Sequence, residues 1–355
     1  MVSDQTAARG SRGAVMIDVA RLAGVSQKTV SRVVNDAPYV RPDVRERVKR
    51  AIAELGYRPN VAAQALAQER SHTIGVLSLG TSLVGPSRRV FTLEHEARRL
   101  GYTMALVSVP DLSAHSVADG VATLLKRGVE GVVVEVPTHL VEIDASQLAG
   151  VPVVTSAGWI DGIVQQAVVD FDQAHACQEL IEYLLGLHHE TVWHIAGPRD
   201  WDAARERVSG WRSALRAAGR PVPPVLYGDW SAASGYRHGL ALAARPDVTA
   251  IFAANDHMAM GVLRALGEAG RKIPDDVSVV GFDDVPEAEF QMVPLTTVSM
   301  DADKAARRIL AELMAMIEGG EPPADPITLA GTRLIIRHSS GPAPPGPRGR
   351  TDRSL

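Results

Sequence analysis

The stretch MIDVARLAGVSQKTVSRVVN, residues 16–35, constrains the fold more than any other part of the chain. Its apolar residues recur at helical spacing and predict one helix over Ile17–Ala23 and a second helix shortly after it. Gly24 lies where the first helix must stop, and glycine tolerates the positive φ of a helix C-terminus. Ser26 has a suitable side chain to N-cap the second helix. We therefore expect a helix-turn-helix unit close to the N-terminus.

The second helix of this unit has a polar outer face. We predict that Gln27, Lys28 and Arg32 point outward, because the inward stripe is formed by Val30, Val33 and Val34. Amide, ammonium and guanidinium groups on a short helix can contact base edges in a DNA major groove. A helical hairpin with an ordinary solvated face is the alternative. Neighbouring polar residues would add contacts, mainly to phosphates: Ser26, Thr29, Ser31, Asn35 and Tyr39.

A third helix completes a small all-α headpiece at residues 16–59. Apolar spacing predicts this helix over Pro42–Leu55, with Gly56 as its stop. Residues 1–70 hold 12 Lys and Arg against 7 Asp and Glu, whereas the rest of the chain holds 25 against 34. A basic module on an acidic body suits phosphate contact at one end, although a solvated basic face is the alternative.

The composition of the 355-residue chain, with 46% apolar and 22% charged residues, is that of a globular protein. Its single cysteine, Cys177, excludes an intrachain disulfide and favours a reducing compartment, so we expect a cytoplasmic protein. No apolar run is long enough to span a bilayer, and residues 1–15 lack the apolar core of a secretion signal. We expect a disordered arm at residues 1–15 and a disordered tail at residues 339–355.

From Ser71 onward, short apolar runs alternate with helical stretches. Runs such as TIGVLSL and GVVVEV have the pattern of strands buried on both faces. The alternation restarts midway and predicts two α/β lobes over residues 71–338, each with a mainly parallel, Rossmann-like sheet. Ligands of such sheets bind beyond the carboxyl ends of the strands, so we expect a ligand cleft between the lobes.

Polar side chains that follow the strands of the second half indicate the ligand class. Arg205, Asn255 and Asp283 follow three different strands and offer the donors and acceptors that sugar hydroxyls require. The face of Trp230 could cover the apolar side of a sugar ring. Each of the three polar residues could instead be structural. Ligand contact and helix N-capping are equally open for two further residues, Asp202 and Asp256.

An enzymatic function has little support in the sequence. Asp283 and Asp284 are adjacent, and successive side chains of an extended segment point in opposite directions, so they make a poor shared-proton pair. The motifs G-x-S-x-G, G-x-x-x-x-G-K-[ST], G-x-G-x-x-G and H-E-x-x-H are missing, and no Cys/His cluster is present. We predict a non-enzymatic protein without a metal or cofactor.

The N-terminal segment resembles a known family. The stretches DVARLAGVSQKTVSRVVN, AELGYRPN and AAQALA, within Met16–Leu66, are similar to the headpiece and hinge of the LacI/GalR family of bacterial transcription regulators. This resemblance implies that residues 60–70 form a hinge helix that pairs with a second subunit's hinge in the DNA minor groove. It implies contacts from Asn60 and Ala63 and a wedge at Leu66 between base pairs. A linker residue packed on the body is the alternative for Leu66.

The remainder resembles the sugar-binding, periplasmic-binding-protein-like core of the same family, so the similarity spans Met16–Ile336. It is carried by AGPRDWDAARERVSGW, GDWSAASG, AANDHMAMG and DDVSVVGFDDVPEAEFQMVPLTT. By this resemblance Arg205, Asn255 and Asp283 would hydrogen-bond a sugar, and Trp230 would lie against its ring.

Other positions of the core follow or leave the family pattern. Leu83 and Pro86 match positions on the apolar side of the pocket, whereas Leu79 and Ala157 replace polar residues. The C-terminal tail has no leucine heptads like those of a tetramerising helix, so the resemblance implies a homodimer.

These features predict a dimeric, sequence-specific repressor of carbohydrate-utilisation genes that binds a near-palindromic operator in double-stranded DNA. A sugar bound between the lobes would favour one lobe arrangement and release the operator. A co-repressor ligand in the same fold is the alternative. A sugar-binding protein without DNA function would leave the headpiece unexplained. The sequence identifies neither the sugar nor the operator bases.

Overall fold

The computed structural model describes residues 14–57, 70–80, 84–136, 143–148, 150–156 and 158–345, without the side chains of 84–86. The chain divides into two compact units, Met1–Ser71 and His72–Leu355. Among the described residues, no helix has the length and apolar character to cross a bilayer.

The first unit is a three-helix headpiece, with helices α1 (Met16–Ala23), α2 (Gln27–Val34) and α3 (Pro42–Leu55). Its core is small, and one valine from each helix is fully buried: Val19, Val30 and Val48. Both glycine stops are confirmed, because Gly24 and Gly56 have φ of 64° and 57°. Leu22 shares the helical spacing of the α1 core, yet it is 46% exposed and lies outside that core.

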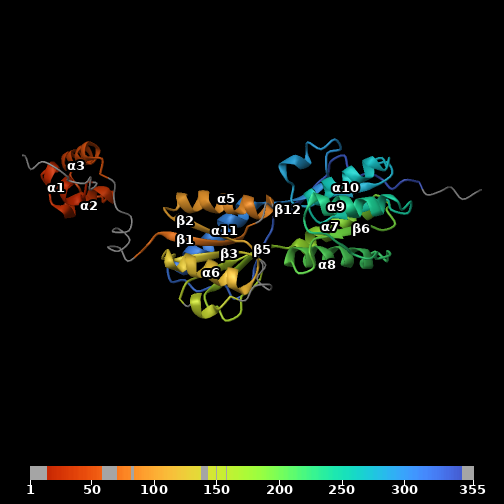
Figure 1. Cartoon of the computed structure of the whole chain (residues 1–355), viewed down its shortest axis with the longest axis horizontal. Helices are drawn as coiled ribbons and strands as arrows, with labels where there is room; N and C mark the ends of the chain where they lie inside the picture. The colour runs from red at the N-terminus through yellow and green to blue at the C-terminus, as the bar shows by residue number, and fades with distance from the viewer. Residues whose placement is uncertain are drawn as a thin grey trace, which may run out of the picture. The chain divides into compact units, whose positions relative to one another are not determined.

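The second unit has two lobes, and the first is built on a six-stranded, entirely parallel sheet (Figure 1). In spatial order its strands are β11 (Ile327–Leu329), β5 (Gln166–Phe171), β4 (Val153–Thr155), β3 (Gly131–Glu135), β1 (Thr73–Leu79) and β2 (Thr103–Val109). One face is covered by α5 (Val84–Arg99) and α11 (Ala302–Ile317). The other face is covered by α6 (Ala114–Lys126) and the short helix η2 (Ala145–Leu148).

The second lobe contains a four-stranded parallel sheet and a two-stranded antiparallel ribbon. The sheet has the order β7 (Leu226–Tyr227), β6 (Trp193–Ala196), β8 (Ala250–Ala253) and β9 (Ser278–Val280). The helices α7 (Gln173–Gly186) and α8 (Asp202–Ala217) cover one face. The other face is covered by α9 (Ala232–Ala243) and α10 (Asp256–Glu268). The ribbon pairs β10 (Thr297–Met300) with β12 (Thr332–Ile335), and η3 (Pro286–Ala288) follows β9.

The chain passes between the lobes three times. It leaves the first lobe after β5, returns from β10 into α11, and crosses again between β11 and β12. As a result, α11 and β11 complete the first lobe although they follow the whole second-lobe sheet in sequence. Their side chains Ile309, Leu313 and Leu329 belong to the same core as Ile74 and Val133 of the first lobe.

The start of the C-terminal tail differs from the expectation. We expected disorder from residue 339, but Ser339 is fully buried and its carbonyl accepts from the Val279 amide at 2.7 Å. Its hydroxyl donates to the Val279 carbonyl at 2.6 Å, and the Ala343 amide donates to the Leu187 carbonyl at 2.8 Å. The boundary is therefore wrong for residues 339–343, because polar groups in this segment satisfy backbone groups of β9.

Candidate functional site

The polar face of α2 begins at a well-formed cap. The Ser26 hydroxyl accepts from the Thr29 amide at 3.2 Å and lies 2.9 Å from the Thr29 hydroxyl. This geometry satisfies one of the free amides at the start of α2 and fixes the direction in which the helix leaves the turn. Gln27, Lys28 and Arg32 are exposed, as the sequence predicts. The face therefore presents an amide and two cations on a short, rigid helix.

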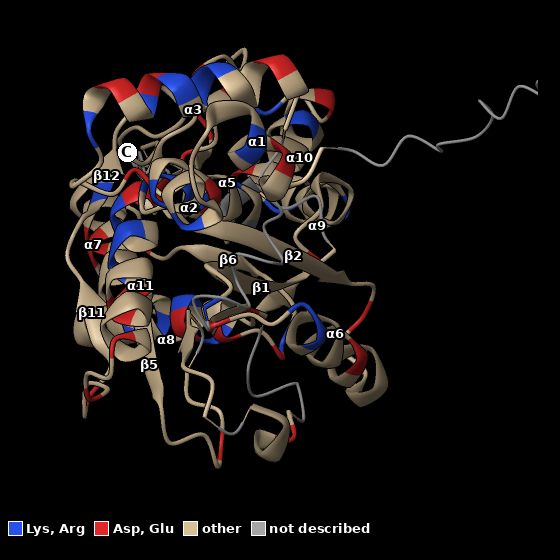
Figure 2. Ribbon diagram, turned by 90° about the vertical axis from the view of Figure 1, so that its left-hand side faces the viewer, with Lys and Arg blue, Asp and Glu red and all other residues tan. Residues whose placement is uncertain are grey.

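The loop after α2 is fastened from α3. Arg45 forms an ion pair with Asp36 and donates to the Ala37 carbonyl at 2.7 Å. Tyr39, further along this loop, is 94% exposed. Figure 2 shows both basic and acidic residues along α3. The structure thus brings Gln27, Lys28 and the other predicted α2 residues onto one helix, with Asn35 and Tyr39 just beyond it.

Several predicted site residues lie outside the described residues: Asn60, Ala63, Leu66 and Leu83, together with Ala157. Pro86 lies in the first turn of α5, and its side chain is not described. The contacts expected of these residues stay predictions.

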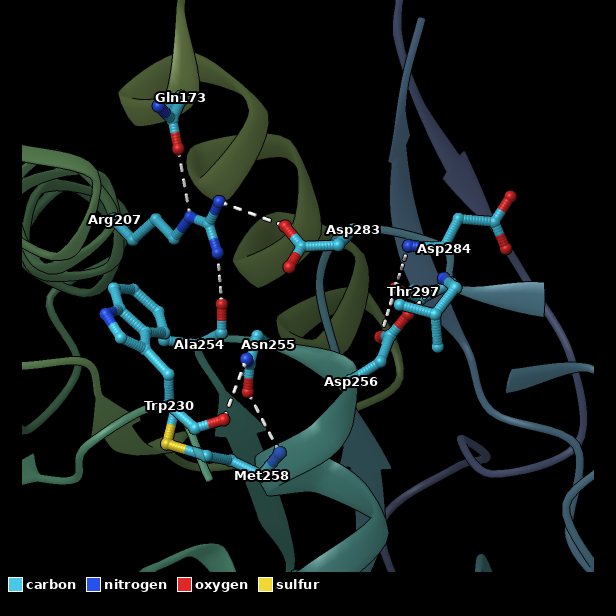
Figure 3. Close-up of polar contacts among 11 residues, drawn as sticks. Gln173, Arg207, Trp230, Ala254, Asn255, Asp256, Met258, Asp283, Asp284 and Thr297 are labelled. Carbon is cyan, nitrogen blue, oxygen red and sulfur yellow. Dashed lines mark hydrogen bonds and ion pairs between the residues drawn. The ribbon is translucent and has the colours of Figure 1, made fainter. Parts of the chain in front are cut away.

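A buried arginine organises the polar residues of the second lobe (Figure 3). Arg207 on α8 donates from Nε to Gln173 Oε1 at 3.0 Å and from Nη2 to Asp283 Oδ1 at 3.1 Å. Its Nη1 donates to the Ala254 carbonyl, which follows β8. The guanidinium also lies 3.8 Å from the centre of the Phe282 ring. These contacts tie together α7, α8 and the carboxyl ends of β8 and β9, where a parallel sheet binds its ligands.

Asn255 and Trp230 stand beside this arginine (Figure 3). Asn255 caps α10 by accepting from the Met258 amide at 2.9 Å, and its amide group donates to the Trp230 carbonyl at 3.0 Å. Trp230 has φ of 69°, and its ring packs so closely on Gly197 that a Cβ there would lie 2.2 Å from it. Trp230 Nε1 is buried and has no hydrogen-bond partner among the described residues. Asn255 therefore has a structural role, whatever else it contacts.

The segment that carries Asp283 is held from two sides. Asp283 and Asp284 have φ of 104° and 51°, which are unfavourable for residues other than glycine. Asp284 pairs with Arg337 at 2.8 Å, whereas Asp283 pairs with Arg207, so the two carboxylates point to different partners. They do not form a dyad, as the sequence predicted, although the backbone here is not the extended one on which that prediction rested.

Asp256, which precedes this segment in the sequence, also holds it in place. Its carboxylate accepts from the Val285 amide at 2.8 Å and from the Thr297 hydroxyl at 2.6 Å. Burial, with the charge of Asp283, raises the pKa of Asp256 to about 8. Of the two roles left open for Asp256, the N-cap is wrong, because Asn255 caps α10 and Asp256 is its first residue.

The predicted Arg205 lies apart from this polar cluster, and a second arginine of α8, Arg207, lies in it. Arg205 is 54% exposed on its side chain and pairs with Asp202 one turn before it, whereas the Arg207 side chain is 5% exposed. Two residues rotate a helix by about 200°, so the two arginines lie on opposite faces. The spacing could have shown this, because Arg207 lies four residues before the buried Trp211. Asp202 is the first residue of α8 and is likewise not its N-cap.

A helix-turn-helix headpiece joined to a two-lobed, parallel-sheet core defines a class of DNA-binding regulators with a ligand site in the core. Residues 15–60 match the bacterial regulatory proteins of the lacI family, and residues 181–340 match the periplasmic binding protein-like domain. The lactose operon repressor of Escherichia coli K12 is 33% identical over 86% of this chain and 85% of its own. The chain therefore belongs to the LacI family of bacterial transcription regulators.

Further relatives agree with this assignment. The regulator CelR of Thermobifida fusca is 36% identical over 90% of this chain and 96% of its own. A Lac repressor dimer bound to operator and the anti-inducer ONPF has a TM-score of 0.83 at 30% identity, covering 93% of this chain and all of that one. A CelR–cellobiose complex has a TM-score of 0.67 at 33% identity, covering 92% and 99%. The expected family and fold are confirmed.

Proposed function

We propose that this protein is a dimeric repressor whose affinity for its operator falls when a sugar binds between the two lobes. One observation carries the proposal: a capped, outward-facing polar helix and a polar cluster at the carboxyl ends of a parallel sheet occur in one chain. The first suits a DNA major groove, and the second suits a polyhydroxylated ligand.

In the headpiece, Gln27, Lys28 and Arg32 contact base edges, because they are exposed and offer donors that match guanine and adenine. The other polar residues of this face position the helix through phosphates: Ser26, Thr29, Ser31, Asn35 and Tyr39. Residues 60–70 supply a hinge, with Asn60 and Ala63 in the minor groove and Leu66 as the wedge.

In the core, Arg207 and Asp283 hydrogen-bond the sugar, and Trp230 and Asn255 shape the site around them. Arg207 replaces Arg205 in this role, because only Arg207 reaches the cluster. Leu83 and Pro86 line the apolar side. We infer that the protein has no enzymatic activity and needs no cofactor, since its relatives include the lactose operon repressor and the transcriptional regulator CelR. It acts in the bacterial cytoplasm, where operator DNA lies.

A second copy of the chain completes the regulator. Phe290 and Met292 of the second lobe are 81% and 103% exposed, and Phe290 borders a shallow hollow of about 380 Å³ with Pro286 and Gln291. Contiguous exposed apolar surface can mark a protein interface, and we infer that these two side chains belong to one. The Lac repressor structure that covers 93% of this chain is a dimer bound to its operator. Two headpieces would then occupy successive half-sites of a near-palindromic operator.

The direction of the response is tested on operator DNA. The full-length protein first selects its operator from a pool of random DNA duplexes. The selected duplex is labelled with a fluorophore, and sugars are titrated into the protein–DNA complex while the fluorescence anisotropy is measured. We expect a sugar to lower the anisotropy by releasing the operator. Tighter binding in the presence of sugar would instead show a co-repressor. A protein that selects no DNA sequence would contradict the regulator proposal altogether.

A further inference from the structure

The first lobe contains a buried ion pair, Arg89 with Glu135, to which the proposed function assigns no role. Nε and Nη2 of Arg89, on α5, each lie 2.8 Å from Oε2 of Glu135. The Ser156 hydroxyl donates to the same oxygen at 3.2 Å. The other carboxylate oxygen, Glu135 Oε1, is buried and has no hydrogen-bond partner among the described residues. Within the described part of the chain, the pair therefore leaves one strong acceptor without a donor.

These groups lie at the carboxyl edge of the first-lobe sheet. Glu135 is the last residue of β3, Ser156 follows β4 directly, and Asp170 is near the end of β5. Because the strands are parallel neighbours, their carboxyl ends meet at one edge. Burial raises the pKa of both Asp170 and Asp283, and each value is held down in part by the arginine of the other lobe, Arg207 for Asp170 and Arg89 for Asp283. Both sets of charged groups lie at the carboxyl ends of parallel strands, where ligands of such sheets bind.

Stability alone does not account for the pair. Two buried charges must be desolvated, and apolar side chains of similar volume often stabilise a core at least as well. An unsatisfied buried acceptor adds a further cost. Glu135 has no exposed side-chain surface, whereas Arg89 keeps 20%. A ligand hydroxyl can accept from a guanidinium and donate to a carboxylate, so a sugar is suited to complete this arrangement.

The balance of charge limits what can enter. Arg89 and Arg207 are each paired with a carboxylate, Glu135 and Asp283 respectively. Asp170 is a third acidic group beside them, and burial raises its pKa to about 6. A phosphate or carboxylate on the ligand would meet excess negative charge and two cations that are already paired.

We propose that Arg89 and Glu135 select the effector by charge: they bind an uncharged, hydroxyl-bearing end of a sugar and reject sugars with a phosphate or carboxylate there. This inference rests on the proposed function, because it assumes that a sugar binds between the lobes.

The first test uses wild-type, full-length protein and matched pairs of sugars in isothermal titration calorimetry. The pairs are cellobiose and cellobiose 6-phosphate, lactose and lactose 6-phosphate, ribose and ribose 5-phosphate, and galactose and galacturonate. We expect at least one neutral sugar to bind and its anionic partner to bind at least 100-fold more weakly. An anionic partner that binds as tightly, or more tightly, would overturn the charge rule and leave the proposed function intact. If no sugar of either kind binds, the proposed function fails and this inference fails with it.

The second test changes the charge without changing the shape. In Glu135→Gln one negative charge is lost, so the neutral sugar should bind more weakly while its anionic partner gains at least 10-fold. A purely structural role would weaken both partners equally and leave their ratio unchanged, which would contradict the proposal. Arg88→Met, at an exposed neighbouring position of α5, is the matched control and should leave the ratio as in wild type. Asp170→Asn should shift the ratio in the same direction as Glu135→Gln, and it serves if that variant fails to fold.

Discussion

The two arginines of α8 allow a sharp comparison, because they lie two residues apart in very different surroundings. We consider Arg207→Met and Arg205→Met, which remove the same charge and keep an unbranched stem. Arg207 has 5% of its side chain exposed and donates to Gln173, Ala254 and Asp283. Arg205 has 54% exposed and one ion pair, with Asp202.

The expected magnitudes differ because of this burial. Breaking a buried ion pair by removing one partner costs about 3–5 kcal/mol, since the remaining charge is left uncompensated. Arg207 lowers the pKa of Asp283 against the burial that raises it, so its loss should drive Asp283 toward protonation. An exposed pair within one helix contributes about 0–1 kcal/mol. Arg207→Met should therefore cost several times more than Arg205→Met.

Urea unfolding at pH 7, followed by tryptophan fluorescence, measures both free energies, because Trp193, Trp211 and Trp230 report on the second lobe. A cycle with Asp283→Asn isolates the pair, and we expect a coupling above about 1 kcal/mol. Sugar titrations on the operator complex should show a lost response for Arg207→Met alone. The reasoning is refuted if the two single variants cost the same, or if Arg205→Met alone abolishes the response.

Three further predictions concern local features. Ser26→Ala should destabilise the headpiece by about 1 kcal/mol and weaken operator binding, whereas Ser26→Asn should not, as hydrogen exchange and anisotropy would show. Gly235→Ala should destabilise the protein by about 1–3 kcal/mol, because the new Cβ would lie 2.1 Å from the Met258 carbonyl oxygen. Gly267→Ala has open space around its Cβ and should be neutral or stabilising by up to about 1 kcal/mol. Thermal unfolding of the two variants measures the difference. Burial lowers the pKa of His194 to about 3, so its contribution to stability is present above pH 6.5 and is lost as the pH falls toward 3, by about 1.4 kcal/mol per pH unit. Urea titrations at pH 7, 6 and 5 should give a smaller pH slope for His194→Gln than for wild type, and equal slopes would contradict this.

The features that the sequence predicted correctly are local ones. The glycine stops of α1 and α3 and the Ser26 cap depend on a few neighbouring residues, so residue type is enough to find them. The alternation of apolar strands and helices likewise depends on short-range pattern, and it predicted two parallel-sheet lobes. The family resemblance added the headpiece and hinge as a unit.

What could not be predicted depends on contacts between distant residues. The choice between Arg205 and Arg207 depends on which face of α8 packs on the sheet; residue type does not give this, and only the spacing to Trp211 indicates it. Arg89 and Glu135 are 46 residues apart, so neither is distinguished by its own neighbourhood. The tail was judged by its Pro, Gly and Arg content, which says nothing of a β9 backbone that Ser339 could satisfy.

The passage of the chain between the lobes has a consequence for synthesis on the ribosome. The first lobe begins at β1, yet its core includes Ile309 and Leu313 of α11, and its sheet ends at β11. While the second-lobe sheet is being translated, the exposed face of the first sheet has no α11 to cover it. The nascent first lobe therefore cannot complete its core and its sheet until α11 and β11 have been translated. A truncated messenger that ends at β10 would yield an intact headpiece on an unfinished and aggregation-prone lobe.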